Sequence, residues 1–182
     1  MKYLSCTETA KLIRQALKES FPGVKFSVKS SSYAGGASIG VRWTDGPSAA
    51  MVESVAKKFQ GSYFDGMTDY KGSCYALVDG LMTSFGADYV TCSREHSDAA
   101  IERAIAQVQR QLGDVAEAAT VEAYRSGSLY RVQVWNEDLQ ALIRRAAYRH
   151  SFTLAPRKSK TAGRVIYAGN DGYSTVAALS VE

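Results

Sequence analysis

The chain is poor in the residues that build metal centres, disulfide frameworks and common nucleophilic sites. Its 182 residues include three cysteines and two histidines. The cysteines are odd in number and widely spaced, which argues against a disulfide framework and favours reduced, apolar thiols. No apolar run approaches the ~20 residues of a membrane-spanning helix, and the N-terminus lacks the pattern of a secretory signal. We therefore expect a cytoplasmic protein with no membrane partner.

Acidic residues are missing from one long stretch near the C-terminus. The net charge is +4, and no acidic residue lies between Asp138 and Asp171. We predict that the basic residues of this stretch form a surface that binds a nucleic acid or another acidic partner, with a solvated face of no binding role as the alternative interpretation. These residues are Arg144, Arg145, Arg149, Arg157, Lys158, Lys160 and Arg164, with His150 as an eighth cation at low pH and Tyr148, Phe152 and Tyr167 as neighbouring aromatics.

The residue pattern in the first half of the chain predicts a helix, a β-hairpin and a second helix. Ser5-x-x-Glu8 has the form of a capping box, and apolar residues follow it at helical spacing. Alternating apolar residues over 24–43, interrupted at Gly35-Gly36, predict two antiparallel strands. A further apolar stripe over 48–60 predicts the second helix. The N-terminal region is therefore expected to have an αββα order, followed by further short strands.

The second half predicts another α+β unit, with its boundary near residues 95–97. Asp98 begins a segment with apolar residues at helical spacing. Further helices are expected over 115–124 and after a cap at Asn136, and strands over 129–135, 153–158, 164–168 and 173–179. We predict an α+β fold with domains at 1–95 and 96–182, the second smaller, with antiparallel strands and a basic surface.

Candidate catalytic and metal-binding sets are sparse. Cys92 and His96, with Cys74, would supply three zinc ligands, one fewer than a tetrahedral site needs. His96 and His150 are the only imidazole bases that a nucleophile could use. Four aspartates are numerous enough for a carboxylate pair but stand mostly in contexts that favour turns: Asp65, Asp69, Asp79 and Asp88. We therefore predict no metal, no cofactor and no enzymatic activity.

Six short segments in the N-terminal half combine turns and strand fragments in a specific arrangement, at residues 3–11, 21–28, 33–39, 41–47, 64–67 and 84–90. Together they resemble the large polyvalent protein-associated domain 29 of phages and conjugative elements. The resemblance covers residues 1–95 and implies a mobile-element protein that acts around DNA transfer or host defence. It offers no catalytic residues, and most shared positions are apolar, Gly or Pro. Such positions suit a frame that carries interaction surfaces.

Two functional hypotheses follow. In the first, the protein is a non-enzymatic antagonist of host defence, anti-CRISPR-like or anti-restriction-like, that docks on a defence protein or nuclease complex. A simple DNA mimic is disfavoured within this class, because such a protein would be strongly acidic, whereas the pI here is near 8.9. In the second, the chain is an accessory module that binds DNA or RNA through the basic residues between 144 and 164.

Overall fold

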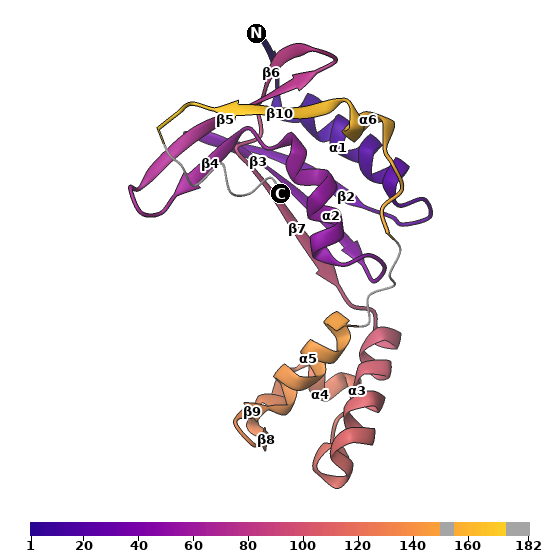
Figure 1. Cartoon of the computed structure of the whole chain (residues 1–182). Helices are drawn as coiled ribbons and strands as arrows, with labels where there is room; N and C mark the ends of the chain where they lie inside the picture. The colour runs from indigo at the N-terminus through magenta and orange to yellow at the C-terminus, as the bar shows by residue number, and fades with distance from the viewer. Residues whose placement is uncertain (150–154, 174–182) are drawn as a thin grey trace. The chain divides into compact units, whose positions relative to one another are not determined.

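The computed structural model describes residues 1–149 and 155–173, which are grouped in two compact units (Figure 1). The first unit comprises Met1–Trp43, Ala49–Ser93 and Leu154–Glu182. The second comprises Thr44–Ser48 and Arg94–Thr153. The second unit is therefore inserted in the sequence of the first. This grouping differs from the predicted division into 1–95 and 96–182, because the C-terminal segment belongs to the first unit.

The first unit is built from both helices and strands, so the predicted α+β class is confirmed. Its elements are β1 (Lys2–Leu4), α1 (Cys6–Ser20), β2 (Ser27–Tyr33), β3 (Gly36–Thr44), α2 (Ala49–Ala56), the 3₁₀ turn η1 (Lys57–Phe59), β4 (Ser62–Asp65), β5 (Tyr70–Val78), β6 (Leu81–Phe85), β7 (Tyr89–Glu95), α6 (Lys160–Gly163) and β10 (Val165–Asn170). The specific αββα order is not confirmed, because the chain starts with a strand and only then forms α1.

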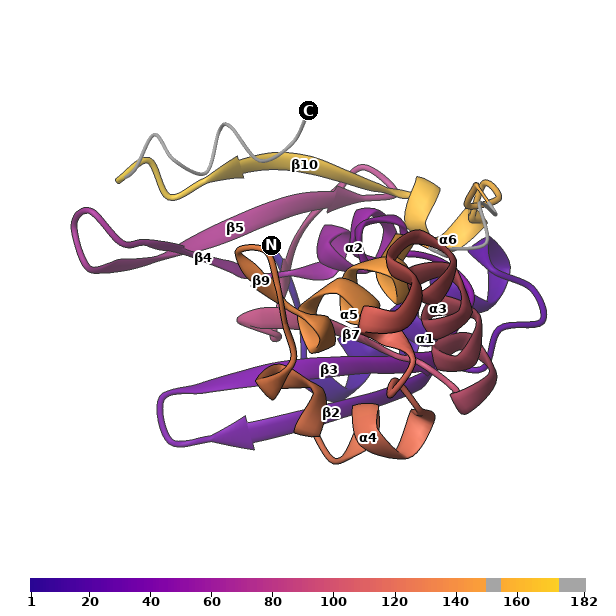
Figure 2. The ribbon, with the colours of Figure 1, turned by 90° about the horizontal axis from the view of Figure 1, so that it is seen from below.

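The strands of the first unit form two sheets. One has the order β1-β6-β5-β10, with β4 also paired to β5, and the other has the order β2-β3-β7. β1 runs parallel to β6, whereas β5 is antiparallel to β4, β6 and β10. Figure 2 shows the β5–β10 pair and the β2–β3 hairpin on opposite sides of this unit. β10 therefore completes a sheet whose other strands precede it by about 80 residues or more.

One apolar core joins the two sheets and the helices of the first unit. Ile13 and Leu17 of α1, Ile39 and Val41 of β3, and Phe59 of η1 are fully buried in it. The capping box forms as predicted: the Ser5 hydroxyl accepts from the Glu8 amide, and the Glu8 carboxylate accepts from the Ser5 amide. This cap satisfies backbone donors at the helix start, so the first turn of α1 is held where it meets β1.

The Gly-Gly turn of the hairpin is required by two different constraints. Gly35 has a φ of +86°, a left-handed conformation that disfavours other residues. At Gly36, an added Cβ would lie 2.4 Å from an Asp88 carboxylate oxygen. That carboxylate accepts from the Ala37 amide at 2.9 Å and so fixes the start of β3. The turn is thus a structural feature that ties the hairpin to β7.

The second unit is mainly helical. Its elements are α3 (Asp98–Leu112), the 3₁₀ turn η2 (Gly113–Ala116), α4 (Val121–Arg125), the 3₁₀ turn η3 (Ser128–Arg131), β8 (Gln133–Val134), β9 (Glu137–Asp138) and α5 (Leu139–Arg149). Ser97 caps α3, and Ile101 and Ile105 of this helix pack with Leu139 and Ile143 of α5. The helical stripes predicted for α3 and α5 are therefore the faces that form this second core.

Four predictions for the second half were wrong in detail. Residues 115–124 form η2 and the short α4 in place of one helix, and residues 129–135 form η3 and the two-residue β8 in place of one strand. The cap of α5 is Asp138, whose carboxylate accepts from the Ala141 amide at 2.7 Å, and not Asn136. Of the predicted closing strands, 164–168 corresponds to β10, and 155–158 form no strand. Residues 153, 154 and 174–179 lie outside the described part.

Candidate partner-binding site

The seven predicted basic residues are divided between the two units. Arg144, Arg145 and Arg149 lie on α5 of the second unit. The other four, Arg157, Lys158, Lys160 and Arg164, lie in and around α6 of the first unit. All seven are exposed. Tyr148 lies on α5 and Tyr167 on β10, whereas His150 and Phe152 are outside the described residues. Neither unit therefore contains the whole set.

The excess of positive charge belongs to the first unit. Of the 22 lysines and arginines, 14 fall within the first unit, together with nine of the 18 acidic residues. The second unit has eight arginines, nine acidic residues and no lysine. Long-range attraction of a polyanion therefore favours the first unit, and any anion binding by the second unit must be local.

Glu19 fastens the C-terminal basic residues to α1. Its carboxylate accepts hydrogen bonds from the Ser159 hydroxyl at 2.6 Å, the Thr161 amide at 2.9 Å and the Thr161 hydroxyl at 3.0 Å. The Arg157 amide also donates to the Ser20 carbonyl at 2.9 Å. Led by the Ser159 bond, these contacts lower the pKa of Glu19 from 4.5 to about 2. The segment is thereby held against the last turn of α1, as Figure 1 shows for α6.

This attachment brings cations from both ends of the sequence into the same part of the first unit, and we call this set the basic strip. Lys11 and Lys18 are seven residues apart on α1 and therefore lie on one side of the helix. Glu19 and Ser20, which follow Lys18, hold the segment of residues 157–161. Arg164 lines the same pocket as Lys2 and Lys11. The strip consists of Lys2, Lys11, Lys18, Arg157, Lys158, Lys160 and Arg164.

A pocket of about 490 Å³ lies at one end of the basic strip, and we call it the first-unit pocket. It is bounded by β1, α1, the β5–β6 turn and the α6 region. Its apolar lining consists of Leu4, Leu12, Phe59, Val78, Leu81 and Val165, and two threonines, Thr83 and Thr161, add hydroxyl groups. Leu81 is 53% exposed at its edge. Such a surface suits an apolar side chain of a partner.

The charged rim of the first-unit pocket is positive overall. Arg164 makes two contacts with Asp79, one of them from Nε at 2.6 Å, and the hydrogen bond from Arg164 lowers the pKa of Asp79. Glu8 is occupied by the Ser5 amide at 2.8 Å and hydroxyl at 2.6 Å. Within residues 1–149 and 155–173, Lys2 and Lys11 form no ion pair. A carboxylate on a partner would therefore complement this rim.

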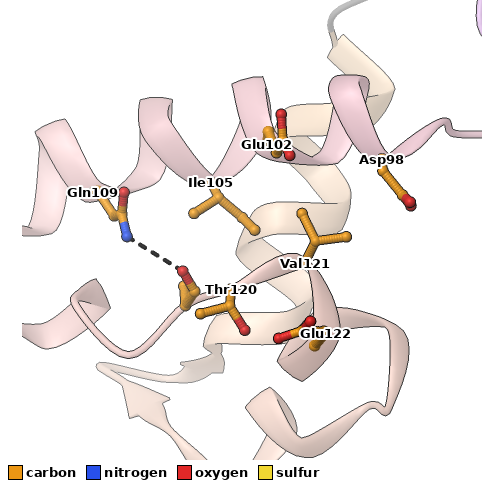
Figure 3. A pocket seen from close by; sticks show the side chains of 8 residues that line it. Asp98, Glu102, Ile105, Gln109, Thr120, Val121 and Glu122 are labelled. Carbon is orange, nitrogen blue, oxygen red and sulfur yellow. Dashed lines mark hydrogen bonds between the residues drawn. The ribbon is translucent and has the colours of Figure 1, made fainter.

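The second unit has a shallow acidic pocket of about 570 Å³ between α3 and α4 (Figure 3). Asp98 and Glu102 of α3 and Glu122 of α4 line it around the apolar Ile105 and Val121. The Asp98 carboxylate forms an ion pair with Arg125 at 2.8 Å. In the described part of the chain, no three His, Cys, Asp or Glu side chains come together as a metal site. We assign no ligand to this pocket.

The surroundings of the candidate cysteines and of His96 shift their pKa values so that the thiolate and imidazolium forms are disfavoured. Burial raises the pKa of Cys92 to about 11 and also raises the pKa of Cys74. Burial, and then the charge of Arg94, lower the pKa of His96, whose ring lies 5.0 Å from the Tyr148 ring. Thiolates are therefore scarce at neutral pH, and His96 is mainly an uncharged ring within the second unit.

The four candidate aspartates lie apart from one another, in turns and strand contacts. Asp65 accepts from the Met67 amide at 2.9 Å, and Asp69 has a positive φ in a turn. Asp79 pairs with Arg164, whereas Asp88 pairs with Lys71 at 2.8 Å. Asp88 also accepts from the Ser62 hydroxyl. The carboxylates of Asp65, Asp79 and Asp88 hold turns or strands, and the four aspartates form no carboxylate pair.

The fold and the pocket define a two-unit α+β protein with an open, positively rimmed apolar pocket in its first unit. Residues 4–97 match the family described as large polyvalent protein associated domain 29, and the chain belongs to this family, which confirms the predicted resemblance. Membership associates the protein with phages and other mobile elements. Comparison with curated proteins and with solved structures finds no match.

Proposed function

We propose that the protein is a non-enzymatic antagonist of host defence that docks on a defence protein or nuclease complex through the first-unit pocket. The supporting observation is the pocket itself, because an apolar cavity with a positively charged rim accepts an apolar anchor flanked by acidic residues. Aromatic or aliphatic anchors in such cavities carry much of the energy of protein interfaces. The association with mobile elements gives the context in which a defence complex would be the partner.

The test is protection of phage in cells with an active CRISPR or restriction system. Expression of the protein should raise the plating efficiency of a targeted phage. Leu81→Glu and Lys11→Glu should abolish most of this effect, because the first places a charge at the apolar edge of the pocket and the second reverses a charge of its rim. Lys29→Glu, an exposed charge reversal on β2 outside the pocket, serves as the matched control.

Purified components then separate docking from catalysis. The protein should inhibit the purified nuclease complex in a one-to-one ratio and remain bound to it in gel filtration. Inhibition at far less than one equivalent would show turnover and would overturn the non-enzymatic proposal. Equal inhibition by the pocket variants and wild type would place docking elsewhere on the protein.

A second candidate function, duplex DNA binding, is supported by the basic strip. Glu19 attaches the C-terminal segment with its cations to α1, and Lys2, Lys11 and Arg164 line one pocket. A gel-shift titration should show binding that weakens with salt. Lys158→Glu should weaken the binding, whereas Arg144→Glu, on the second unit, should not. Equal loss in both variants would favour a single basic surface formed by the residues between 144 and 164 over the strip.

A further inference from the structure

The second unit has a groove between α3 and α5 that the functions above do not use. The groove encloses about 320 Å³. Val108, Leu112, Leu142 and Ala146 form its apolar part, while Gln107, Gln111, Arg145 and Arg149 add amide and guanidinium groups. Trp135, from the turn between β8 and β9, completes the lining. The groove therefore combines an aromatic ring, hydrogen-bonding amides and cations.

Trp135 is unusual in both exposure and backbone conformation. Its side chain is 85% exposed, and its φ is +54°. A bulky residue in the left-handed region costs on the order of 1–2 kcal/mol relative to an ordinary conformation, a cost that glycine avoids. The turn thus holds a large indole in solvent at a position where the backbone would favour a smaller residue. An exposed indole face is a stacking surface for a planar ligand.

The charges around the groove favour an anionic ligand. Among the residues that the structure describes, no Asp or Glu lines the groove. Arg145 is paired with Glu137, whereas Arg149 forms no ion pair within the described ranges 1–149 and 155–173. Both cations are arginines, whose planar guanidinium groups bind phosphate through two parallel hydrogen bonds. The two arginines of this groove can therefore neutralise the charge of one or two phosphates.

We propose that the α3–α5 groove binds single-stranded nucleic acid, with one base stacked on Trp135 and the adjoining phosphates on Arg149 and Arg145. The two glutamines supply donors and acceptors for the edge of a base that has left its stack. Exposed bases are available in a single strand, whereas a duplex buries them. An acidic peptide would satisfy the arginines but would not require the indole, and the test below separates these ligands.

Binding is measured on the full chain with a fluorescein-labelled oligothymidylate of about 12 nucleotides, a length within single-strand site sizes. Fluorescence anisotropy should show saturable binding at low salt. In a Trp43→Phe background, which removes the buried tryptophan, the remaining Trp135 emission should be quenched by the stacked base. Because about two phosphates are neutralised, log K should fall with log salt at a slope of roughly −1.4.

Two variants separate stacking from charge. Trp135→Gly should reduce affinity roughly ten- to a hundredfold, the effect of losing one stacked base. Its melting temperature should be equal or higher, because glycine relieves the left-handed backbone, so lost binding cannot be assigned to unfolding. Arg149→Glu should also weaken binding. Arg131→Glu, outside the groove lining and beside Tyr130, should leave it unchanged.

Two control ligands test whether binding depends on contacts with the bases. An abasic oligonucleotide of equal length keeps the phosphates and should bind at least tenfold more weakly than oligothymidylate. Poly-L-glutamate, a polyanion without bases, should neither quench Trp135 nor compete. Equal binding of either control would overturn the proposal in favour of a general anion or acidic-peptide surface. Undisturbed Trp135 emission, or full affinity in Trp135→Gly, would overturn it as well.

Discussion

Replacing Glu19 tests whether one carboxylate attaches the returning C-terminal segment to α1. In Glu19→Ala, three hydrogen bonds from Ser159 and Thr161 are lost. A pKa near 2 against an ordinary 4.5 sets an upper bound of about 3 kcal/mol for the stabilisation. Solvent screening at this partly exposed carboxylate lowers our expectation to about 2 kcal/mol. The melting temperature of the first unit should then fall by about 4–8 °C.

The pH dependence gives a second readout with a defined sign. Because the folded state lowers the pKa of Glu19, its stabilisation is complete above about pH 4.5 and is lost as the pH falls toward 2. Denaturant titrations of wild type and Glu19→Gln should therefore differ most near neutral pH. The difference should narrow as the pH is lowered through this range. Other carboxylates titrate in both proteins and cancel in the comparison.

The control is Glu53→Gln, which removes an exposed carboxylate paired with Lys57 at i+4. Such pairs contribute about 0.3–0.5 kcal/mol, so this variant should melt close to wild type. Hydrogen exchange provides a local measurement, because the Thr161 amide should lose protection in Glu19→Ala. An unchanged melting temperature together with unchanged Thr161 protection would refute the assigned role of Glu19.

Three further predictions concern close packing, thiol reactivity and a buried phenol. Gly61→Ala should destabilise by about 3 kcal/mol or more in urea, because its Cβ would lie 1.9 Å from a backbone oxygen, whereas Gly163→Ala meets nothing within 4 Å and should be neutral or slightly stabilising. Cys92, with a pKa of about 11, should react with Ellman's reagent at pH 8 at least tenfold more slowly than free cysteine; equal rates would contradict its burial. Burial, and then the hydrogen bond to Asp171, raise the pKa of Tyr63, so Asp171→Asn should lower its titration midpoint in ultraviolet absorbance, and no change would rule out the contact.

Local sequence patterns predicted the elements that local interactions determine. Ser5 and Glu8 lie three residues apart, so their reciprocal cap is visible in the sequence and is present in the structure. Gly35 and the alternation around it likewise predicted the β2–β3 hairpin. β1 was missed because it has three residues and pairs in parallel with β6, about 80 residues later. A strand of this length has too few residues to show a period of two.

The predicted basic surface stays a prediction, and the structure divides its residues between two units. The cluster between residues 144 and 164 is continuous in the chain, but the two units divide it. Lys2 and Lys11, which edge the first-unit pocket beside Arg164, were not recognised. Both are ordinary exposed lysines in the sequence, and no local pattern connects them with α6. The contacts of Glu19 with Ser159 and Thr161, together with the pairing of β10 with β5, bring these residues to one pocket.

The pairing of β10 with β5 also determines when, during synthesis of the chain, the first sheet can be completed. Val78 meets its partner Val165 only after about 90 further residues have been synthesised. At about 5–20 residues per second, a ribosome needs roughly 5–20 s for that stretch. During this interval the inserted helices can fold, while the nascent first unit still exposes an unpaired strand edge. Its last strand therefore sets the time at which the edge of β5 is covered and no longer open to pairing with another chain.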